Sequence, residues 1–198
     1  MARLLLATNN PGKVREFRRL LRDVPVETVT PADLGIALDV VEDGSSYEEN
    51  ARKKAEAFAE AGGCLAMADD SGIEVGALDG GPGYLSARYG GPGLDDEGRV
   101  QKLLEAIADV PDGQRGGRFR AVIAVAAPGA ETRCFDGVVE GRITHEVRGD
   151  GGFGYDPIFE RADGRTTAEM TDDEKDAVSH RGHAVRAAIP YIRELAGC

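Results

Sequence analysis

The sequence predicts an α/β fold in which a mixed β-sheet carries helices on its faces. Three observations predict it. The chain opens as strand, tight loop and helix, because an apolar run at residues 4–8 is followed by an Asn-Pro-Gly turn and by helical apolar spacing over residues 14–22. Residues 119–147 have the pattern of three strands joined by turns. The end of the chain is helical, and such a combination favours a mixed sheet flanked by helices.

The remaining elements follow from apolar spacing and from end signals. A capping-box pattern, Ser46 with Glu49, opens one helix, and Gly62 with Gly63 ends it. In order, we predict a strand at 4–8, helices at 14–22 and 46–60, a strand at 64–68, a helix at 95–108, strands at 119–127, 131–140 and 143–147, a short helix opened by Thr171 and Glu174, and a last helix from Ser179 to about Ala196. We expect a single domain over residues 1–198.

Composition narrows the setting. The chain has 24 basic and 35 acidic residues and a net charge of −11, which excludes a general binder of nucleic-acid polymers. Hydrophobic residues make up 41%, enough for a packed core. The three cysteines are far apart and form no Cys-x-x-Cys pair, which suits a reducing cytoplasm. No apolar run approaches the ~20 residues of a membrane-spanning helix, so we expect no membrane partner.

The loop of residues 8–13 connects the first strand to the first helix. A helix N-terminus presents unpaired N–H groups and a partial positive charge, which suit phosphate, and Lys13 adds a full charge. The loop is not a Walker A motif, which needs glycine where Ala7 stands and serine or threonine where Val14 stands. The same residues also fit a plain turn with a lysine in solvent.

Asp69 and Asp70 follow the strand at 64–68 directly. Adjacent carboxylates beyond a strand can hold a hard cation such as Mg²⁺, and one of them can deprotonate an attacking water. Glu42 and Asp43, before Gly44, are candidates for a further acidic ligand. An ordinary acidic turn has the same pattern.

Three further segments carry candidate groups. The basic run at residues 52–54 spreads over about 300° of a helix, so its members cannot all face one site, and spacing does not choose among them. The aromatic-glycine segment 153–157 suits stacking on a base, or equally an anchored turn. In the segment 179–183, Arg181 suits an anion or carbonyl contact, or the solvent, and Lys175 belongs to the same basic patch. No zinc site is expected there.

Taken in order, these motifs resemble the non-canonical purine nucleoside triphosphate pyrophosphatases, also called inosine triphosphate or dITP/XTP pyrophosphatases. The resemblance covers essentially the whole chain. It rests on residues 6–16, on Glu49-Asn50-Ala51 with Lys54-Ala55, on 68–72, on Ser86-Ala87-Arg88-Tyr89, on 153–157, on Ala168-Glu169-Met170 and on Ser179-His180-Arg181-Gly182.

The resemblance implies a fold and an activity. The fold would be an elongated α/β structure with a mixed central sheet flanked by helices and an active-site cleft between two lobes. The enzyme would be a hydrolase that uses Mg²⁺ to cleave ITP, dITP or XTP into the nucleoside monophosphate and pyrophosphate, and so cleanses the nucleotide pool. It would be a cytoplasmic homodimer whose partner is a small-molecule nucleotide.

The resemblance also implies roles for single residues. Asp70 would be the proton acceptor and a metal ligand, Asp69 would support it as the second catalytic residue, and Glu42 would be the other metal ligand. From the basic run it selects Lys54. The residues that would bind substrate are Thr8, Asn9, Asn10, Pro11, Gly12, Lys13, Lys54, Ser71, Phe153, Gly154, Tyr155, Asp156, Lys175, His180 and Arg181. Of these, 8–13, Lys54 and Lys175 would meet the phosphates, 153–156 the base and sugar, and His180 with Arg181 the base carbonyls.

One departure and two alternatives remain. The family usually has an aliphatic residue and then tyrosine before Ser-Ala-Arg-Tyr, whereas the order here is Tyr84-Leu85, which suggests different packing at that point, as in a dimer interface. A Maf-like pyrophosphatase acting on other nucleotides is the first alternative, and a nucleotide sensor without catalysis is the second. A substrate panel discriminates all three.

Overall fold

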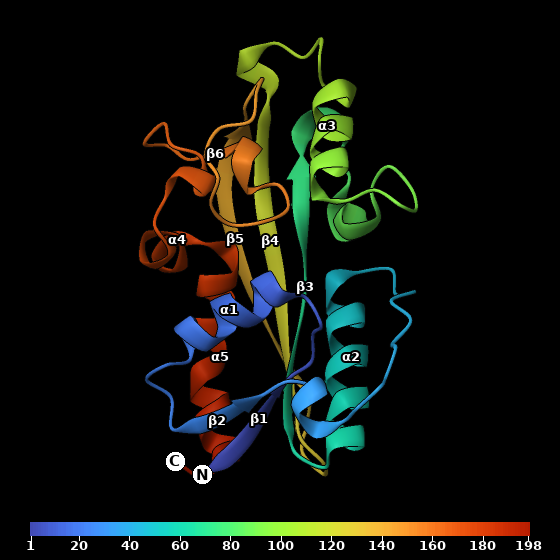
Figure 1. The fold of residues 1–198 in the computed structure, drawn as a ribbon, viewed down its shortest axis with the longest axis vertical. Coiled ribbons are helices and arrows are strands. Elements are labelled where there is room, and N and C mark those ends of the chain that lie inside the picture. Colours follow the sequence, from blue (N-terminus) through green and yellow to red (C-terminus); the bar gives the residue numbers. More distant parts are fainter. The chain divides into compact units, whose positions relative to one another are not determined.

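The computed structural model describes residues 1–198 and contains the predicted mixed sheet, six strands in the order β2-β1-β3-β4-β5-β6 (Figure 1). β1 pairs in parallel with β2 and β3, whereas β5 and β6 pair antiparallel. The strands are β1 (Ala2–Leu6), β2 (Val26–Val29), β3 (Leu65–Val75), β4 (Gly116–Ala126), β5 (Arg133–Ile143) and β6 (Phe159–Glu160). The α-helices are α1 (Pro11–Leu20), α2 (Tyr47–Gly62), α3 (Asp96–Ala106), α4 (Asp172–Val178) and α5 (His180–Ala196). None of the helices has the length and apolar character needed to cross a membrane.

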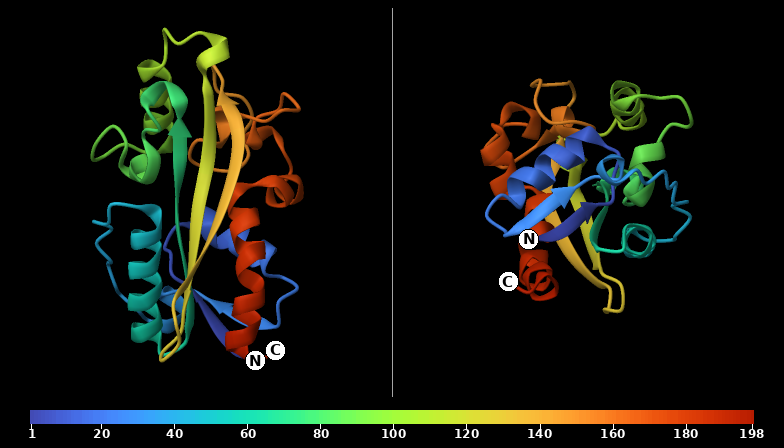
Figure 2. Two further views of the ribbon diagram at one scale, coloured as in Figure 1. Left: turned by 180° about the vertical axis from the view of Figure 1, so that it is seen from behind. Right: turned by 60° about the horizontal axis from the view of Figure 1, so that its bottom comes forward.

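The chain forms two compact units, each assembled from separate stretches. Unit 1 comprises residues 1–70, 121–137 and 180–198, and unit 2 comprises residues 71–120 and 138–179. The single domain over residues 1–198 stays a prediction. Both termini lie in unit 1, side by side in Figures 1 and 2.

Unit 1 is built on the apolar run that opens the chain. Leu4, Leu5 and Leu6 are each 0% exposed, because both faces of β1 are covered. Leu4 and Leu6 belong to the core cluster formed with Phe17 of α1 and the apolar side of α5, whereas Leu5 lies against Gly62 at the end of α2. Both figures accordingly show α2 on one side of β1, and α1 and α5 on the other.

Unit 2 has its own core. Val100 and Leu103 of α3, with Ile107 directly after it, pack with apolar side chains of β3, β4 and β5 and with Phe159. The guanidinium of Arg115 is buried beside this core and donates to three backbone carbonyls, those of Ile107, Ile143 and Thr144, at 2.7–2.9 Å. A charged group is tolerated there because every acceptor it faces is a backbone carbonyl oxygen, so its buried donors are hydrogen-bonded.

The predicted strand at 64–68 is correct in place but wrong in its end. β3 continues to Val75, so Asp69 and Asp70 lie inside a strand rather than in a turn after it. An adjacent acidic pair is unfavourable in a buried strand unless cations and donors compensate both charges. The side chains that do so come from α1, α2 and α5, far away in sequence, and they are described below.

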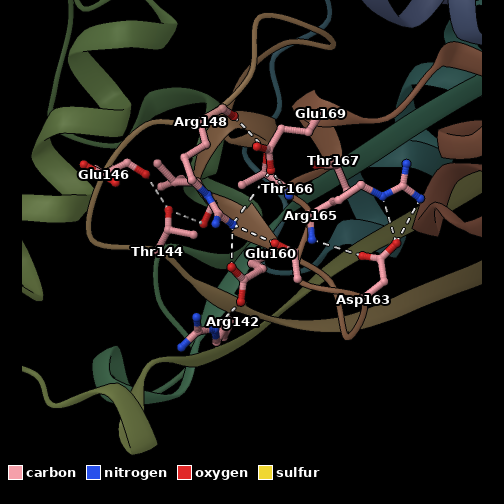
Figure 3. Close-up of polar contacts among 12 residues, drawn as sticks. Arg142, Thr144, Glu146, Arg148, Glu160, Asp163, Arg165, Thr166, Thr167 and Glu169 are labelled. Atoms are coloured by element: carbon pink, nitrogen blue, oxygen red, sulfur yellow. Dashed lines mark hydrogen bonds and ion pairs between the residues drawn. The ribbon is translucent and has the colours of Figure 1, made fainter.

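The predicted strand at 143–147 is wrong. β5 ends at Ile143, and the Thr144 hydroxyl donates to the carbonyl of Glu146 at 2.7 Å, a local bond that competes with a strand. β5 pairs at this end with β6, a strand that the sequence pattern does not predict. Glu160 of β6 accepts from Arg142 and Arg148, as Figure 3 shows, and these bonds join β6 to the neighbouring segments.

The helices agree with the prediction apart from their ends. α1 begins three residues early, at Pro11, a residue favoured in the first turn. Ser46 caps α2 and the left-handed Gly63 ends it, as expected. Thr171 and Glu174 form the predicted capping box of α4, and α5 begins directly after Ser179. β2 is the one further strand that the sequence reading missed.

Candidate active site

The loop of residues 8–13 caps its own helix. The Asn10 side-chain oxygen accepts from the backbone N–H groups of Gly12 at 2.8 Å and Lys13 at 3.2 Å, and Thr8 Oγ1 accepts from the Asn10 N–H. Two of the N-terminal amides that suited phosphate are therefore already bonded. The Asn10 side-chain nitrogen donates in none of these bonds. Asn9, Asn10 and Pro11 are exposed, and Gly12 is buried.

Asp69 is the centre of a buried ion-pair network in unit 1. Its side chain is 0% exposed and lies 3.1 Å from the Lys13 ammonium and 3.0 Å from Nε of Arg181. Burial alone would raise the pKa of Asp69, but the attraction of Arg181 and Lys13 outweighs it and holds that pKa well below its usual value. Asp69 is thus a fixed negative charge that joins α1 and α5 to β3.

Arg181 and Glu16 complete this network. Nη1 of Arg181 donates to Glu16 Oε2 at 2.6 Å, and both side chains are almost fully buried. The expected contact of Arg181 with a base carbonyl stays a prediction, and the structure adds two ion pairs that fix the guanidinium. Glu16 is a residue that sequence reasoning missed. The signal was present: Lys13, Glu16 and Phe17 lie three or four residues apart, on one face of α1.

Asp70 lies in a different environment from its neighbour. Burial raises the pKa of Asp70 to about 6, even though the Lys54 charge and a hydrogen bond from Asn50 act in the opposite direction. The Asn50 side-chain nitrogen donates to Asp70 Oδ2 at 3.1 Å, and Lys54 Nζ lies 3.9 Å from Asp70 Oδ1. A carboxylate with a pKa near neutrality is suited to accept a proton.

Asn50 is the second site residue to which the sequence assigns no role, although it belongs to a motif of the resemblance. It is 0% exposed, and its side-chain oxygen accepts from the Gly44 N–H at 2.9 Å. A Cβ on Gly44 would lie 2.7 Å from that oxygen, so the segment of Glu42 packs this closely only with glycine at position 44. Asn50 therefore joins the Glu42 segment to Asp70. Asn50 and Lys54 are one helical turn apart, which was the available signal.

The structure also chooses among the basic run of α2. Lys54 is buried, and its ammonium lies 2.9 Å from Glu42 Oε1 and 2.7 Å from the Asp69 carbonyl oxygen. Arg52 instead contacts Glu48 and the Thr132 carbonyl, and Lys53 contacts the exposed Asp43. Of the three cations, only Lys54 lies among the acidic candidates, in agreement with the selection that the resemblance makes.

Glu42 and Asp70 are the residues that suit a metal ion. Both carboxylates reach the same ammonium, that of Lys54, so they converge on one point. The structure holds no group of three or more histidine, cysteine, aspartate or glutamate side chains close enough to form an all-protein metal cage. Two carboxylates nevertheless match Mg²⁺, which commonly takes one or two from the protein and completes its shell with water and substrate phosphates.

A second group of candidate residues lies in unit 2. The Asp156 carboxylate accepts from the Phe153 N–H at 2.8 Å, from the Lys175 ammonium at 2.5 Å and from the Thr167 hydroxyl at 2.8 Å. A Cβ at Gly152, where φ is +71°, would overlap the same carboxylate. Asp156 thus shapes the turn that presents Phe153, and Thr167 is a member that the sequence did not reveal.

The Phe153 ring is supported from several sides. The Lys175 ammonium lies 5.0 Å from the ring centroid, within the range of a cation–π contact. The Tyr155 hydroxyl donates to the Ser86 carbonyl at 2.9 Å, and the Gly154 N–H donates to Asp96 at 3.0 Å. These bonds tie the turn to two other segments of unit 2. Phe153 itself is only half-buried, which leaves part of its ring accessible.

The predicted residues therefore fall into two groups, one in each unit. Unit 1 holds the loop 8–13 with Glu42, Lys54, Asp69, Asp70, His180 and Arg181. Unit 2 holds Ser71, Lys175 and the segment 153–156. His180 is buried at the start of α5, and Ser71 is half-buried in β3, directly after Asp70.

Comparison with known proteins places this chain among close relatives. A family model described as the Ham1 family matches residues 4–191. The chain is 46% identical to a dITP/XTP pyrophosphatase of Streptomyces coelicolor over all of both chains, and 44% identical to one of Bacillus subtilis over 94% of each. Among solved structures, a HAM1 protein from Coxiella burnetii is similar with a TM-score of 0.87 and 39% identity, covering 98% of this chain and 100% of that one.

Proposed function

The chain belongs to the Ham1 family, and from this premise we propose that it hydrolyses ITP, dITP and XTP to the nucleoside monophosphate and pyrophosphate. Relatives that carry the name dITP/XTP pyrophosphatase match it over their whole length. The observation that carries the proposal is the pair Asp69 and Asp70, adjacent in one strand but with pKa values shifted in opposite directions. Asp69 is a fixed anion between two cations, whereas burial keeps the pKa of Asp70 near 6.

Asp70 is the residue that takes a proton from the attacking water. A general base works best when its pKa lies near the working pH, and the burial of Asp70 provides that condition. The hydrogen bond from Asn50 fixes the orientation of the carboxylate. The water then attacks the α-phosphorus, the bond to the bridging oxygen breaks, and pyrophosphate leaves.

Mg²⁺ is the cofactor that this donor set fits, with Glu42 and Asp70 as its protein ligands. When bound, it supplies positive charge at the phosphates and polarises the phosphoryl group. Lys13 and Lys54 contact the same acidic cluster and are the residues that we expect to meet the phosphate oxygens. All of these charges lie within unit 1.

Recognition of the base falls to Phe153 and to the pair His180 and Arg181. The half-buried ring of Phe153, held by the Asp156 turn, offers a stacking face. His180 and Arg181 carry donors for a 6-keto group. Adenine presents an amino group at that position, so donor would face donor, a mismatch that rejects a substrate strongly.

The pH dependence follows from Asp70. Because this carboxyl must be ionised to accept a proton, kcat/KM is expected to rise with pH through about 6 and to level off above it. The measurement is kcat/KM for ITP between about pH 5 and 8. The affinity for a non-hydrolysable ITP analogue is measured over the same pH range. It shows how much of the pH dependence comes from ionisation of the substrate phosphates rather than of Asp70. A flat profile below neutrality would remove Asp70 from the role of base.

The substrate panel tests the function itself. ITP, XTP and dITP are compared with the four standard ribonucleoside triphosphates, which include UTP, and with dTTP, in the presence of Mg²⁺. We expect the inosine and xanthosine nucleotides to be the best substrates and pyrophosphate to be released. A preference for ATP contradicts the proposal, a preference for pyrimidines points to a Maf-like enzyme, and binding without pyrophosphate release points to a sensor.

A homodimer in the cytoplasm that acts on free nucleotides, and not on nucleic-acid polymers or membranes, completes the proposal. Leu85, in the segment where the sequence departs from the family pattern, is 46% exposed, so its side chain is accessible to a partner. The cleft between two lobes stays a prediction.

A further inference from the structure

Lys54 occupies the position between the two carboxylates that suit a metal ion. Its ammonium lies 2.9 Å from Glu42 and 3.9 Å from Asp70, and it donates to the Asp69 carbonyl at 2.7 Å. The side chain is 10% exposed, so solvent screens these contacts little. In this arrangement a cation of the protein itself offsets part of the negative charge of Glu42 and Asp70.

The charged side chains around Lys54 carry a net negative charge. The cluster contains three cations, Lys13, Lys54 and Arg181, and four carboxylates, Glu16, Glu42, Asp69 and Asp70. Every one of the cations is already in an ion pair. A triphosphate that reached this cluster without a metal would meet one more negative charge than positive charges, and like charges in a buried site repel strongly.

We propose that Lys54 is an exchangeable cation that couples metal binding to triphosphate binding, a role that rests on the proposed function. A divalent cation that binds Glu42 and Asp70 displaces the ammonium from both carboxylates. The ammonium then becomes a donor for a phosphate oxygen. The metal ion therefore frees the ammonium for the triphosphate. The triphosphate in turn holds the ammonium away from the two carboxylates that bind the metal ion.

Lysine is the residue type suited to such an exchange. Its ammonium is a compact charge with three donors on a flexible stem, whereas a guanidinium is a rigid planar fork. The bond from Lys54 to the Asp69 carbonyl uses one donor and keeps the ammonium close while its other two change partners. Arg181, by contrast, is fixed by two carboxylates through its fork.

Thermodynamic linkage makes the proposal measurable. If Lys54 competes with the metal, removing its charge tightens metal binding in the absence of nucleotide. If the displaced ammonium also serves the triphosphate, removing it weakens the mutual enhancement of the two ligands. Both effects follow from one coupling free energy, which is the same measured from either ligand.

The experiment measures Mn²⁺ affinity by electron paramagnetic resonance, with and without α,β-methylene ITP, which cannot release pyrophosphate. For Lys54→Gln we expect Mn²⁺ alone to bind about tenfold more tightly, a change of about 1.4 kcal/mol. We also expect the enhancement by the analogue to fall about tenfold. Lys53→Gln removes a neighbouring charge that pairs only with the exposed Asp43, and it should match the unaltered protein.

Lys13→Gln is the sharper control. It removes a cation of the same cluster, but one that contacts Asp69 and neither Glu42 nor Asp70. Equal tightening of Mn²⁺ binding in Lys13→Gln and Lys54→Gln would show a general field effect and overturn the exchange. Unchanged or weaker Mn²⁺ binding in Lys54→Gln would overturn it as well.

A second measurement keeps the proposal testable should Lys54→Gln fail to fold. In the unaltered protein labelled with ε-¹³C lysine, the Lys54 signal is assigned by its loss in Lys54→Arg. It should shift on addition of Mg²⁺, while the Lys53 signal stays in place. If the chemical shift of the Lys54 signal does not change on addition of Mg²⁺, the exchange is contradicted. Since none of these readouts needs turnover, failure of the proposed hydrolysis and failure of the exchange are distinguishable.

Discussion

Asp70→Asn is expected to lower kcat for ITP by about a thousandfold, because a positioned general base contributes on the order of 10²- to 10⁴-fold. The amide has the size of the carboxyl and can still accept the hydrogen bond from Asn50, so the surroundings of β3 are kept. It cannot take a proton from water. The change also removes one of the two carboxylates that suit the metal ion, which acts in the same direction.

Folding should survive this substitution. Burial raises the pKa of Asp70, which means that the folded protein disfavours its ionised form. A neutral amide avoids that cost, so the melting temperature at pH 7 should be equal or higher. The matched control is Asp43→Asn, which removes an exposed carboxylate beside Glu42 and should keep full activity. If Asp70→Asn retains kcat within about tenfold, Asp70 is not the base.

Asp69→Asn is expected to act on stability, by about 3–5 kcal/mol, since it leaves two buried cations without their common partner. Lys13 loses its ion pair with Asp69, and Arg181 loses the same partner while its ion pair with Glu16 stays. Urea unfolding followed by circular dichroism measures the loss. In the control Asp43→Asn an exposed pair is broken, and the unfolding midpoint should not move. An unfolding curve for Asp69→Asn that matches the unaltered protein would show that the network does not stabilise the fold.

The opposite expectations for two neighbouring aspartates come from their partners. Asp69 faces Lys13 and Arg181, brought to β3 by α1 and α5, whereas Asp70 faces Asn50 and Lys54 of α2. Alternation along the strand directs the two side chains to opposite faces of the sheet, where different helices lie. Because of this placement within unit 1, we expect Asp69 to stabilise the fold and Asp70 to act as the base.

Local pattern was enough to predict most of the fold. The apolar run at Leu4 to Leu6, the capping box at Thr171 and the stop at Gly63 are encoded by neighbours in sequence, and each was found. The strand at 143–147 is predicted wrongly because its alternation is local. In the structure the Thr144 hydroxyl donates to the Glu146 carbonyl, and the N–H groups of Thr144 and Arg148 donate to the carbonyls of Ile158 and Pro157.

The candidate site was less accessible to sequence reasoning. Asp69 and Asp70 were read as a turn because the cations that allow them inside β3 are distant in the chain. Spacing alone did not choose Lys54 from its basic run, whereas burial against Glu42 does. Helical spacing places Glu16 beside Lys13 and Asn50 beside Lys54, but the groups that these two residues bond lie on other segments, so spacing alone does not show their role.

The net charge of −11 is also reflected in the candidate site. The acidic excess extends into the cluster of unit 1, where four carboxylates surround three cations. Such a cluster favours a nucleotide that arrives with a divalent cation over one that arrives alone. The anionic substrate and the acidic protein are thus compatible through the metal.

The product balance for ITP, in the first arm of the substrate panel, tests the central claim most directly. With Mg²⁺ present, the proposed chemistry predicts one IMP and one pyrophosphate for each ITP consumed, and no orthophosphate, as read by ³¹P nuclear magnetic resonance in the absence of added phosphatase. Release of orthophosphate with formation of IDP would mean that the terminal phosphate is cleaved instead, and would contradict the proposed function.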